Sequence, residues 1–216
     1  MSTVQAAGTP VVEEAAAAPV AGRALSSDKA QRIVDSMRSS VARRGTAAST
    51  FDHVAREAGV SRGLLHYYFG TKEQLLVETV RRDCDLRLAE LERRLSTATS
   101  AADFVGVMAQ DLRQGLDEDP DFMTLIFELF TLARRNADIS AEFAGLMRRT
   151  REQVSTLLAE AERKGVVRLS ATPEAATDVL FALGDGLALR ILSEPERDFT
   201  DTMKAALACA QAIVSD

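Results

Sequence analysis

The sequence predicts an all-α protein of about nine helices. Beyond residue 28, apolar side chains recur at steps of three and four, the spacing of one helix face. Ser and Thr stand where these periodic segments begin, and Gly stands where several of them end, as helix caps and stops do. The one candidate strand, "VVRLS" at 166–170, is too short to pair alone.

The chain has 216 residues, of which 46% are hydrophobic, enough to bury a core. Its formal charge is −6, but the charge is unevenly distributed. Residues 23–72 hold nine Lys or Arg against four Asp or Glu, whereas the residues after them are strongly acidic. This asymmetry indicates one part that meets an anion and one that does not.

Residues 1–25 are rich in Ala, Val and Pro without a sustained period, and Pro10 and Pro19 interrupt any helix there. We expect a disordered tail. The segment lacks a basic start and an unbroken apolar run, and no run in the chain approaches 18 apolar residues. We therefore expect no signal peptide, no membrane span and a cytoplasmic location.

Cys84 and Cys209 lie far apart in the sequence and show no metal-ligand spacing. The chain has two His residues and no recognisable nucleophile elbow or phosphate loop. We therefore expect no disulfide, metal, cofactor or catalytic site.

The first helix begins at Asp28 and stops at Gly45. Thr50 can cap a short helix that Gly59 ends, and Ser61 can cap a second one that runs through Phe69. Two short helices across a Gly-containing turn form a helix-turn-helix. Residues 26–72 are therefore predicted to be a helix-turn-helix domain.

A capping box of Thr71 and Gln74 opens a long helix to about Leu95. Residues 73–216 complete a second, helical domain. Its further helices are expected at about 101–117, 121–135, 139–164, 174–193 and 199–214.

The helix that follows Ser61 has the composition of a DNA-reading helix. Arg62 can reach guanine, and Leu64 or Tyr67 can meet a thymine methyl, while a bare glycine allows close approach. Side chains at helix starts and Lys72 can hold phosphates. The predicted DNA-binding residues are Thr50, Ser61, Arg62, Gly63, Leu64, His66, Tyr67 and Lys72. The alternative is that the aromatic cluster merely completes a packed subdomain.

The stretch "TFDHVAREAGVSRGLLHYYFGTKEQLL" within residues 29–76 resembles the DNA-binding domain of the TetR family of bacterial transcription regulators. One departure is that Leu64, Leu65 and His66 stand where the family most often has Thr and then Leu-Tyr. The resemblance implies a repressor that a small molecule releases from a palindromic DNA operator. It also implies that residues 73–216 bind that effector and form a homodimer.

In the family, the last two helices form the dimer interface. The matching apolar and small residues here are Leu183, Gly184, Leu187, Ile191, Met203, Leu207 and Ala210. These faces could instead complete the core of a monomer.

For the effector pocket, Phe and Met residues and two carboxylates within apolar runs are the candidates. They are Phe104, Met108, Phe127, Glu128, Phe130, Met147, Phe181 and Asp185. The aromatic and Met side chains could be ordinary core, and the carboxylates could pair with Arg134 or Arg190.

Three other functions stay open on the sequence. Cys84 or Cys209 could make a redox sensor of the same fold, with Arg81, Arg82 and Arg87 lowering the pKa of Cys84. A small-molecule-binding protein or an enzyme without DNA binding is the alternative from another class. An activator or a nonspecific DNA-coating protein is the third.

Overall fold

The computed structural model describes residues 27–215, which form nine α-helices and one two-stranded ladder. The predicted tail at 1–25 lies outside the described residues. The first four helices are α1 Ser27–Ala48, α2 Phe51–Ala58, α3 Arg62–Phe69 and α4 Lys72–Leu95. The others are α5 Ala101–Glu118, α6 Pro120–Ala133, α7 Ala137–Arg163, α8 Pro173–Ser193 and α9 Thr200–Ile213. The all-α prediction is confirmed.

Helix ends fall where the capping residues stand. Thr50, Ser61 and Thr71 each accept a hydrogen bond from a backbone N–H in the first turn of the next helix. Gly45 interrupts α1 with φ 72°, a backbone angle that favours glycine, so the last residues of α1 form a separate turn after a kink.

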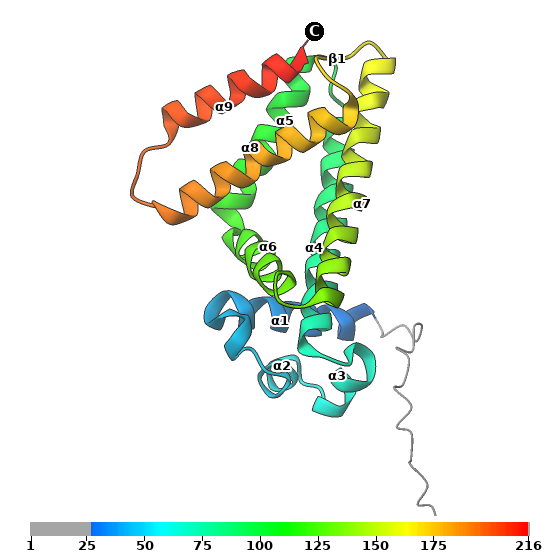
Figure 1. The fold of residues 1–216 in the computed structure, drawn as a ribbon, viewed down its shortest axis with the longest axis vertical. Helices are drawn as coiled ribbons and strands as arrows, with labels where there is room; N and C mark the ends of the chain where they lie inside the picture. The colour runs from blue at the N-terminus through cyan, green and yellow to red at the C-terminus, as the bar shows by residue number, and fades with distance from the viewer. Residues whose placement is uncertain (1–26, 216) are drawn as a thin grey trace, which may run out of the picture.

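The helices form two groups, one at each end of the molecule, and the long helices α4 and α7 connect them (Figure 1). The N-terminal helices α1–α3 gather at one end, α4 and α7 run side by side away from them, and α8 and α9 lie at the other end. β1 (Arg168–Leu169) pairs antiparallel with β2 (Val214–Ser215). The short apolar run at 166–170 thus finds its partner at the far end of the chain.

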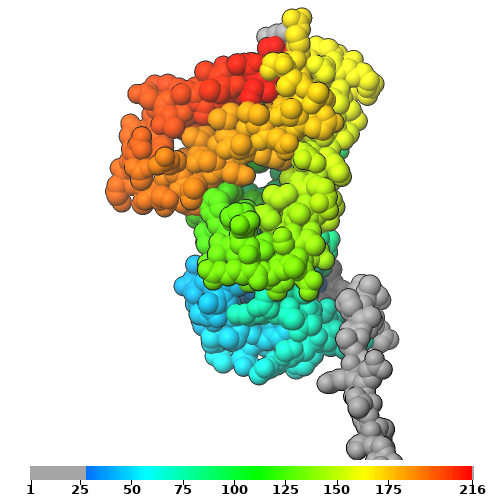
Figure 2. Space-filling view, in the orientation of Figure 1, coloured from blue at the N-terminus to red at the C-terminus, as the bar shows by residue number. Residues whose placement is uncertain are grey.

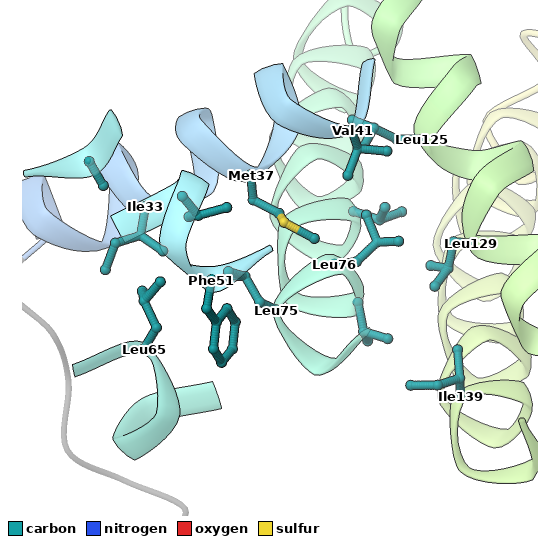
Figure 3. Packing of buried hydrophobic residues seen from close by; sticks show 14 of the residues in the cluster. Ile33, Met37, Val41, Phe51, Leu65, Leu75, Leu76, Leu125, Leu129 and Ile139 are labelled. Atoms are coloured by element: carbon teal, nitrogen blue, oxygen red, sulfur yellow. The ribbon is translucent and has the colours of Figure 1, made fainter. Parts of the chain in front are cut away.

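The first hydrophobic core extends across the expected domain boundary at residue 72. Buried side chains from α1 to α4 pack together with Leu125 and Leu129 of α6 and Ile139 of α7 (Figure 3). A second cluster joins α4, α5, α7 and α8 with Val214. α1, α4 and α6 share the first core, and α4 also contributes to the second. Because both cores are close-packed, a movement of α4 or α6 would displace the side chains of α1 that pack against them.

Candidate functional site

The helix-turn-helix at the α1–α3 end is fixed by three local features. The Thr50 hydroxyl accepts from the N–H of His53, and the Ser61 hydroxyl accepts from the N–H of Leu64 at 3.2 Å. Gly59 adopts φ 66° between the two helices, a left-handed angle that closes the turn. Only Leu65 of α3 is fully buried, so most of this helix faces outward.

The outward face of α3 carries most of the predicted DNA-reading side chains. Arg62, Gly63, His66 and Tyr67 are exposed, and Tyr67 shows 58% of its surface, a large fraction for an aromatic ring. Leu64 differs, because it is half-buried against the first core and offers only part of its side chain. The helix therefore presents a guanidinium, an imidazole and a phenol on one surface.

Polar contacts pre-order this surface. Arg62 forms an ion pair with Asp52 of α2 at 3.3 Å, and its Nε donates to Nε2 of His66. Since Nε2 accepts that hydrogen bond, the proton of a neutral His66 is on Nδ1, which donates to the Gly70 carbonyl at 3.2 Å. Exposed ion pairs of this kind are worth less than about 1 kcal/mol, so DNA can displace them at small cost.

Lys72, at the start of α4, lies at the same end of the molecule but already donates hydrogen bonds to the backbone of α1. Its Nζ donates to the carbonyl oxygens of Thr46 at 2.9 Å and Ala47 at 3.3 Å, which holds the end of α1. Only one of its three N–H groups is left for a phosphate. Lys72 thus joins α4 to α1, a role that its sequence position did not suggest.

Two neighbouring cavities lie among the C-terminal helices, and we call them inner and outer. The inner cavity, of 150 Å³, lies among α4–α8 and is lined by Cys84, Arg87, Leu88, Leu91, Asp111, Leu112, Gly115, Leu116, Phe122, Met123, Thr150 and Phe181. The outer cavity, of 190 Å³, lies mainly among α5, α8 and α9. The two share Leu91, Leu112, Phe181 and the carboxyl-bearing Asp111.

The charged groups of the inner cavity are paired. Arg87 forms an ion pair with Asp119, and its guanidinium lies 4.1 Å from the centroid of the Phe122 ring. Asp111 pairs with Arg94 at 3.3 Å, while burial raises the pKa of its carboxyl. Arg87 and Thr150 could not be predicted as cavity residues, because both occur in charged, outwardly polar stretches of their helices.

The eight predicted pocket residues divide into two groups. Met108, Phe181 and Asp185 line the outer cavity, Phe181 also lines the inner one, and apolar surroundings raise the pKa of Asp185.

The other five line neither cavity. Phe104 is buried in the second core, Phe127 is half-buried on α6, and Phe130 and Met147 are exposed. Glu128 is bound to Thr46, whose hydroxyl donates to it at 2.6 Å, because the kink at Gly45 brings α1 to α6. Its partner is therefore a hydroxyl of α1, and not Arg134 or Arg190, the alternatives to a pocket role that the sequence left open.

The predicted dimer residues face inward more than expected. Leu183, Gly184 and Leu187 of α8 line the outer cavity, as do Met203, Leu207 and Ala210 of α9; Ile191 is half-buried beyond it. The exposed apolar side chains of α8 are instead Val179 and Leu189. None of the residues of α9 is fully buried within the chain. In Figure 2 this helix forms an outer edge of the molecule.

The two cysteines lie in different environments. Burial raises the pKa of Cys84 to about 12, and Asp83 and Asp85 reinforce this effect. Of the three predicted arginines, Arg87 does lower the pKa of Cys84, but its effect is smaller than the effect of burial, and Arg81 and Arg82 both bind Glu78. Cys209 is exposed on α9.

Within residues 27–215, no group of His, Cys, Asp and Glu is arranged to hold a metal ion. No helix in the same part of the chain is long and apolar enough to cross a membrane.

A capped helix-turn-helix with an exposed second helix, attached to a helical body with cavities, defines a class of protein: the helical DNA-binding regulators. Residues 33–79 match the family described as bacterial regulatory proteins, tetR family. Residues 106–212 match the C-terminal region of BetI-type transcriptional repressors. The chain belongs to the TetR family, whose members are regulators rather than enzymes.

Among curated relatives, the HTH-type transcriptional regulator BetI of Agrobacterium fabrum is 47% identical over 49 residues. That match covers 23% of this chain and 24% of the relative, so the chain matches about a quarter of the length of this relative.

Solved structures share the fold over most of this chain. A protein from Saccharomonospora viridis in complex with choline is 22% identical, with a TM-score of 0.70 over 88% of this chain and 100% of that one. FadR from Bacillus subtilis in complex with stearoyl-CoA is 16% identical, with a TM-score of 0.70 over 83% and 96%. At these identities the likeness concerns the fold.

Proposed function

We propose that this protein is a ligand-responsive transcriptional repressor that binds a palindromic operator as a homodimer. The observation that carries the proposal is the exposed face of α3, where Arg62, His66 and Tyr67 stand on a helix held by its own caps. Arg62 and Tyr67 supply base contacts, while Thr50, Ser61 and the remaining N–H of Lys72 contact phosphates. Such a protein acts in the cytoplasm, where bacterial DNA is.

The dimer is proposed to form through α8 and α9. Val179 and Leu189 leave apolar surface exposed on α8, and no residue of α9 is fully buried within its own chain. A second copy that covers these helices would also close the outer cavity, which their inner faces line. Two recognition helices about 34 Å apart could then meet successive major grooves of an operator.

The effector is proposed to bind in the inner cavity. This cavity touches α4, which begins at the DNA-binding end, and α6, which holds Thr46 through Glu128. Ligand and DNA would oppose each other reciprocally, with a coupling of about 1–3 kcal/mol. The two relatives solved with choline and with stearoyl-CoA represent opposite ligand chemistries, a cation and an acyl thioester.

The test is a selection of bound sequences from random duplex DNA by the purified protein. Tyr67→Ala is run alongside, with Phe130→Ala as a matched exposed aromatic on α6, away from α3. We expect a palindrome with the wild-type protein and the control, and its loss with Tyr67→Ala. A protein that enriches no sequence would overturn the regulator proposal in favour of ligand binding without DNA.

A further inference from the structure

Arg87 is the only cationic residue that lines the inner or outer cavity in the described chain. Its guanidinium covers the face of the Phe122 ring at 4.1 Å, and the same group forms the ion pair with Asp119. The wall around it is mostly Leu, Met and Phe. A molecule that enters this cavity therefore meets apolar surface and one guanidinium that only a single carboxylate neutralises directly.

Asp119 connects this guanidinium to the DNA-binding end. The residue stands between α5 and α6, and its other carboxylate oxygen forms an ion pair with Arg38 of α1. Arg38 also lies 3.4 Å from Asp83 of α4. One carboxylate thus bridges a cavity residue and a residue of the first helix.

A second polar group in the same wall has no partner. The hydroxyl oxygen of Thr150 on α7 is buried and makes no hydrogen bond within the described chain. A buried hydroxyl without a partner lowers stability, and a ligand acceptor would recover that loss. Arg87 and Thr150 are thus two donors in one apolar cavity.

We propose that the effector is an apolar molecule with a carboxylate end, which accepts hydrogen bonds from Arg87 and Thr150 and displaces Asp119. The inference rests on the proposed function and specifies its ligand. Once Asp119 is released from Arg87, its hold on Arg38 changes, and α1 and the helix-turn-helix shift with it. The arrangement Arg87–Asp119–Arg38 is the path from ligand to DNA.

A cationic effector fits this cavity poorly. Recognition of a quaternary ammonium relies on open aromatic faces, but the face of Phe122 is covered by Arg87. The acidic residue in the inner wall, Asp111, is already paired with Arg94, and Arg87 lies near enough to add to its stabilisation. An incoming cation would compete with both guanidinium groups.

The binding test compares three probes with the same ten-carbon chain: decanoate, decanol and decyltrimethylammonium, each below its aggregation concentration. Calorimetric titration of the full chain is expected to show the tightest binding for decanoate. Arg87→Gln should weaken decanoate at least about tenfold, since a charge-assisted hydrogen bond is lost, and Thr150→Val should weaken it severalfold.

Arg82→Gln is the matched control, because it removes the same charge from α4 at a residue that binds Glu78 and lines neither cavity. Circular dichroism verifies that each variant is folded. Equal decanoate affinity in the wild type and Arg87→Gln, or cation binding as tight as decanoate binding, overturns the ligand assignment.

The coupling test uses Asp119→Asn, which keeps the size of the side chain but weakens its hold on both arginines. We expect this variant to bind decanoate at least as tightly as the wild type, while decanoate no longer changes its affinity for operator DNA. Release of DNA equal to that of the wild type overturns the path through Asp119. If the wild-type protein selects no DNA at all, the proposed function fails, whereas the calorimetric result still decides the ligand chemistry.

Discussion

The two ends of the molecule differ in how fully they bury their apolar side chains within one chain. At the α1–α3 end, side chains such as Met37, Leu65 and Leu75 are fully buried within one chain. At the other end, α9 buries nothing fully and shares a cavity with α8. The contrast teaches that the α1–α3 end completes its core within one chain, with help from α4, α6 and α7, whereas the α8–α9 end leaves apolar surface that a second copy could cover.

The largest expected effect is the difference in the free energy of unfolding between two Leu→Ala substitutions, one at each end. Leu65→Ala at the packed end should lower the free energy of unfolding by about 2–5 kcal/mol, because it leaves a cavity in a dense core. Leu207→Ala, on the wall of the outer cavity, should cost less than half as much within one chain, because its side chain is already 36% exposed. Urea unfolding at low protein concentration measures both. Equal losses would remove the distinction between the two ends.

The next effect concerns the contact between the ends. Thr46→Val removes the hydroxyl that donates to Glu128 and should destabilise the protein by about 1.5–3 kcal/mol, since the partly buried carboxylate loses its shorter hydrogen bond and keeps only the Thr46 N–H at 3.4 Å. Glu128→Gln retains an acceptor and should cost less. Thermal unfolding of both variants tests the order, and a harmless Thr46→Val would show that this hydroxyl adds nothing to the contact between α1 and α6.

A smaller effect distinguishes two glycines of the helix-turn-helix. Gly59→Ala should destabilise by about 1–2 kcal/mol, because φ 66° is strained for a residue with a Cβ. Gly63→Ala should stabilise by up to about 1 kcal/mol, because the position is helical and its Cβ meets nothing within 4 Å. If α3 approaches DNA closely at Gly63, this more stable variant will bind the operator less tightly. Calorimetric unfolding measures the stability of both variants, and titration with operator DNA measures their affinity for it.

The smallest effect leaves stability unchanged and compares the cysteines. A thiol-specific reagent at pH 8 should modify Cys209 rapidly and leave Cys84 unmodified in the native protein, because burial raises the pKa of Cys84 to about 12. Cys209→Ser should then react only on unfolding. If α9 lies in the dimer interface, labelling of Cys209 should slow as protein concentration rises; a constant rate would place the interface elsewhere.

The sequence allowed the helices to be predicted because their ends are marked by local chemistry. Thr50, Ser61, Thr71 and Thr172 each accept a hydrogen bond in the turn that follows them, so each cap is readable from adjacent residues. The outward position of Tyr67 follows from the same local register, because Leu65 two residues earlier faces the core.

The cavity and the contacts between elements could not be predicted in this way. Glu128 meets Thr46 across 82 residues, and Lys72 reaches the same turn across 26. The inner cavity lies where α4 to α8 converge, and Phe127 and Phe130 miss it although their composition matched that of a pocket. Helical spacing shows that a side chain lies on an apolar face but does not say which neighbour that face meets.

The short ladder between β1 and β2 has a mechanical consequence for α9. The helix is fastened at its C-terminal end, where Val214 is buried against the second core and paired with Leu169. Its other end follows the exposed connection from Ser193 and is anchored by Phe199, whose ring stacks with Arg197. A second chain bound against α9 would therefore rotate this helix about its C-terminal end, which the ladder holds. That rotation would widen or narrow the outer cavity, which α9 lines.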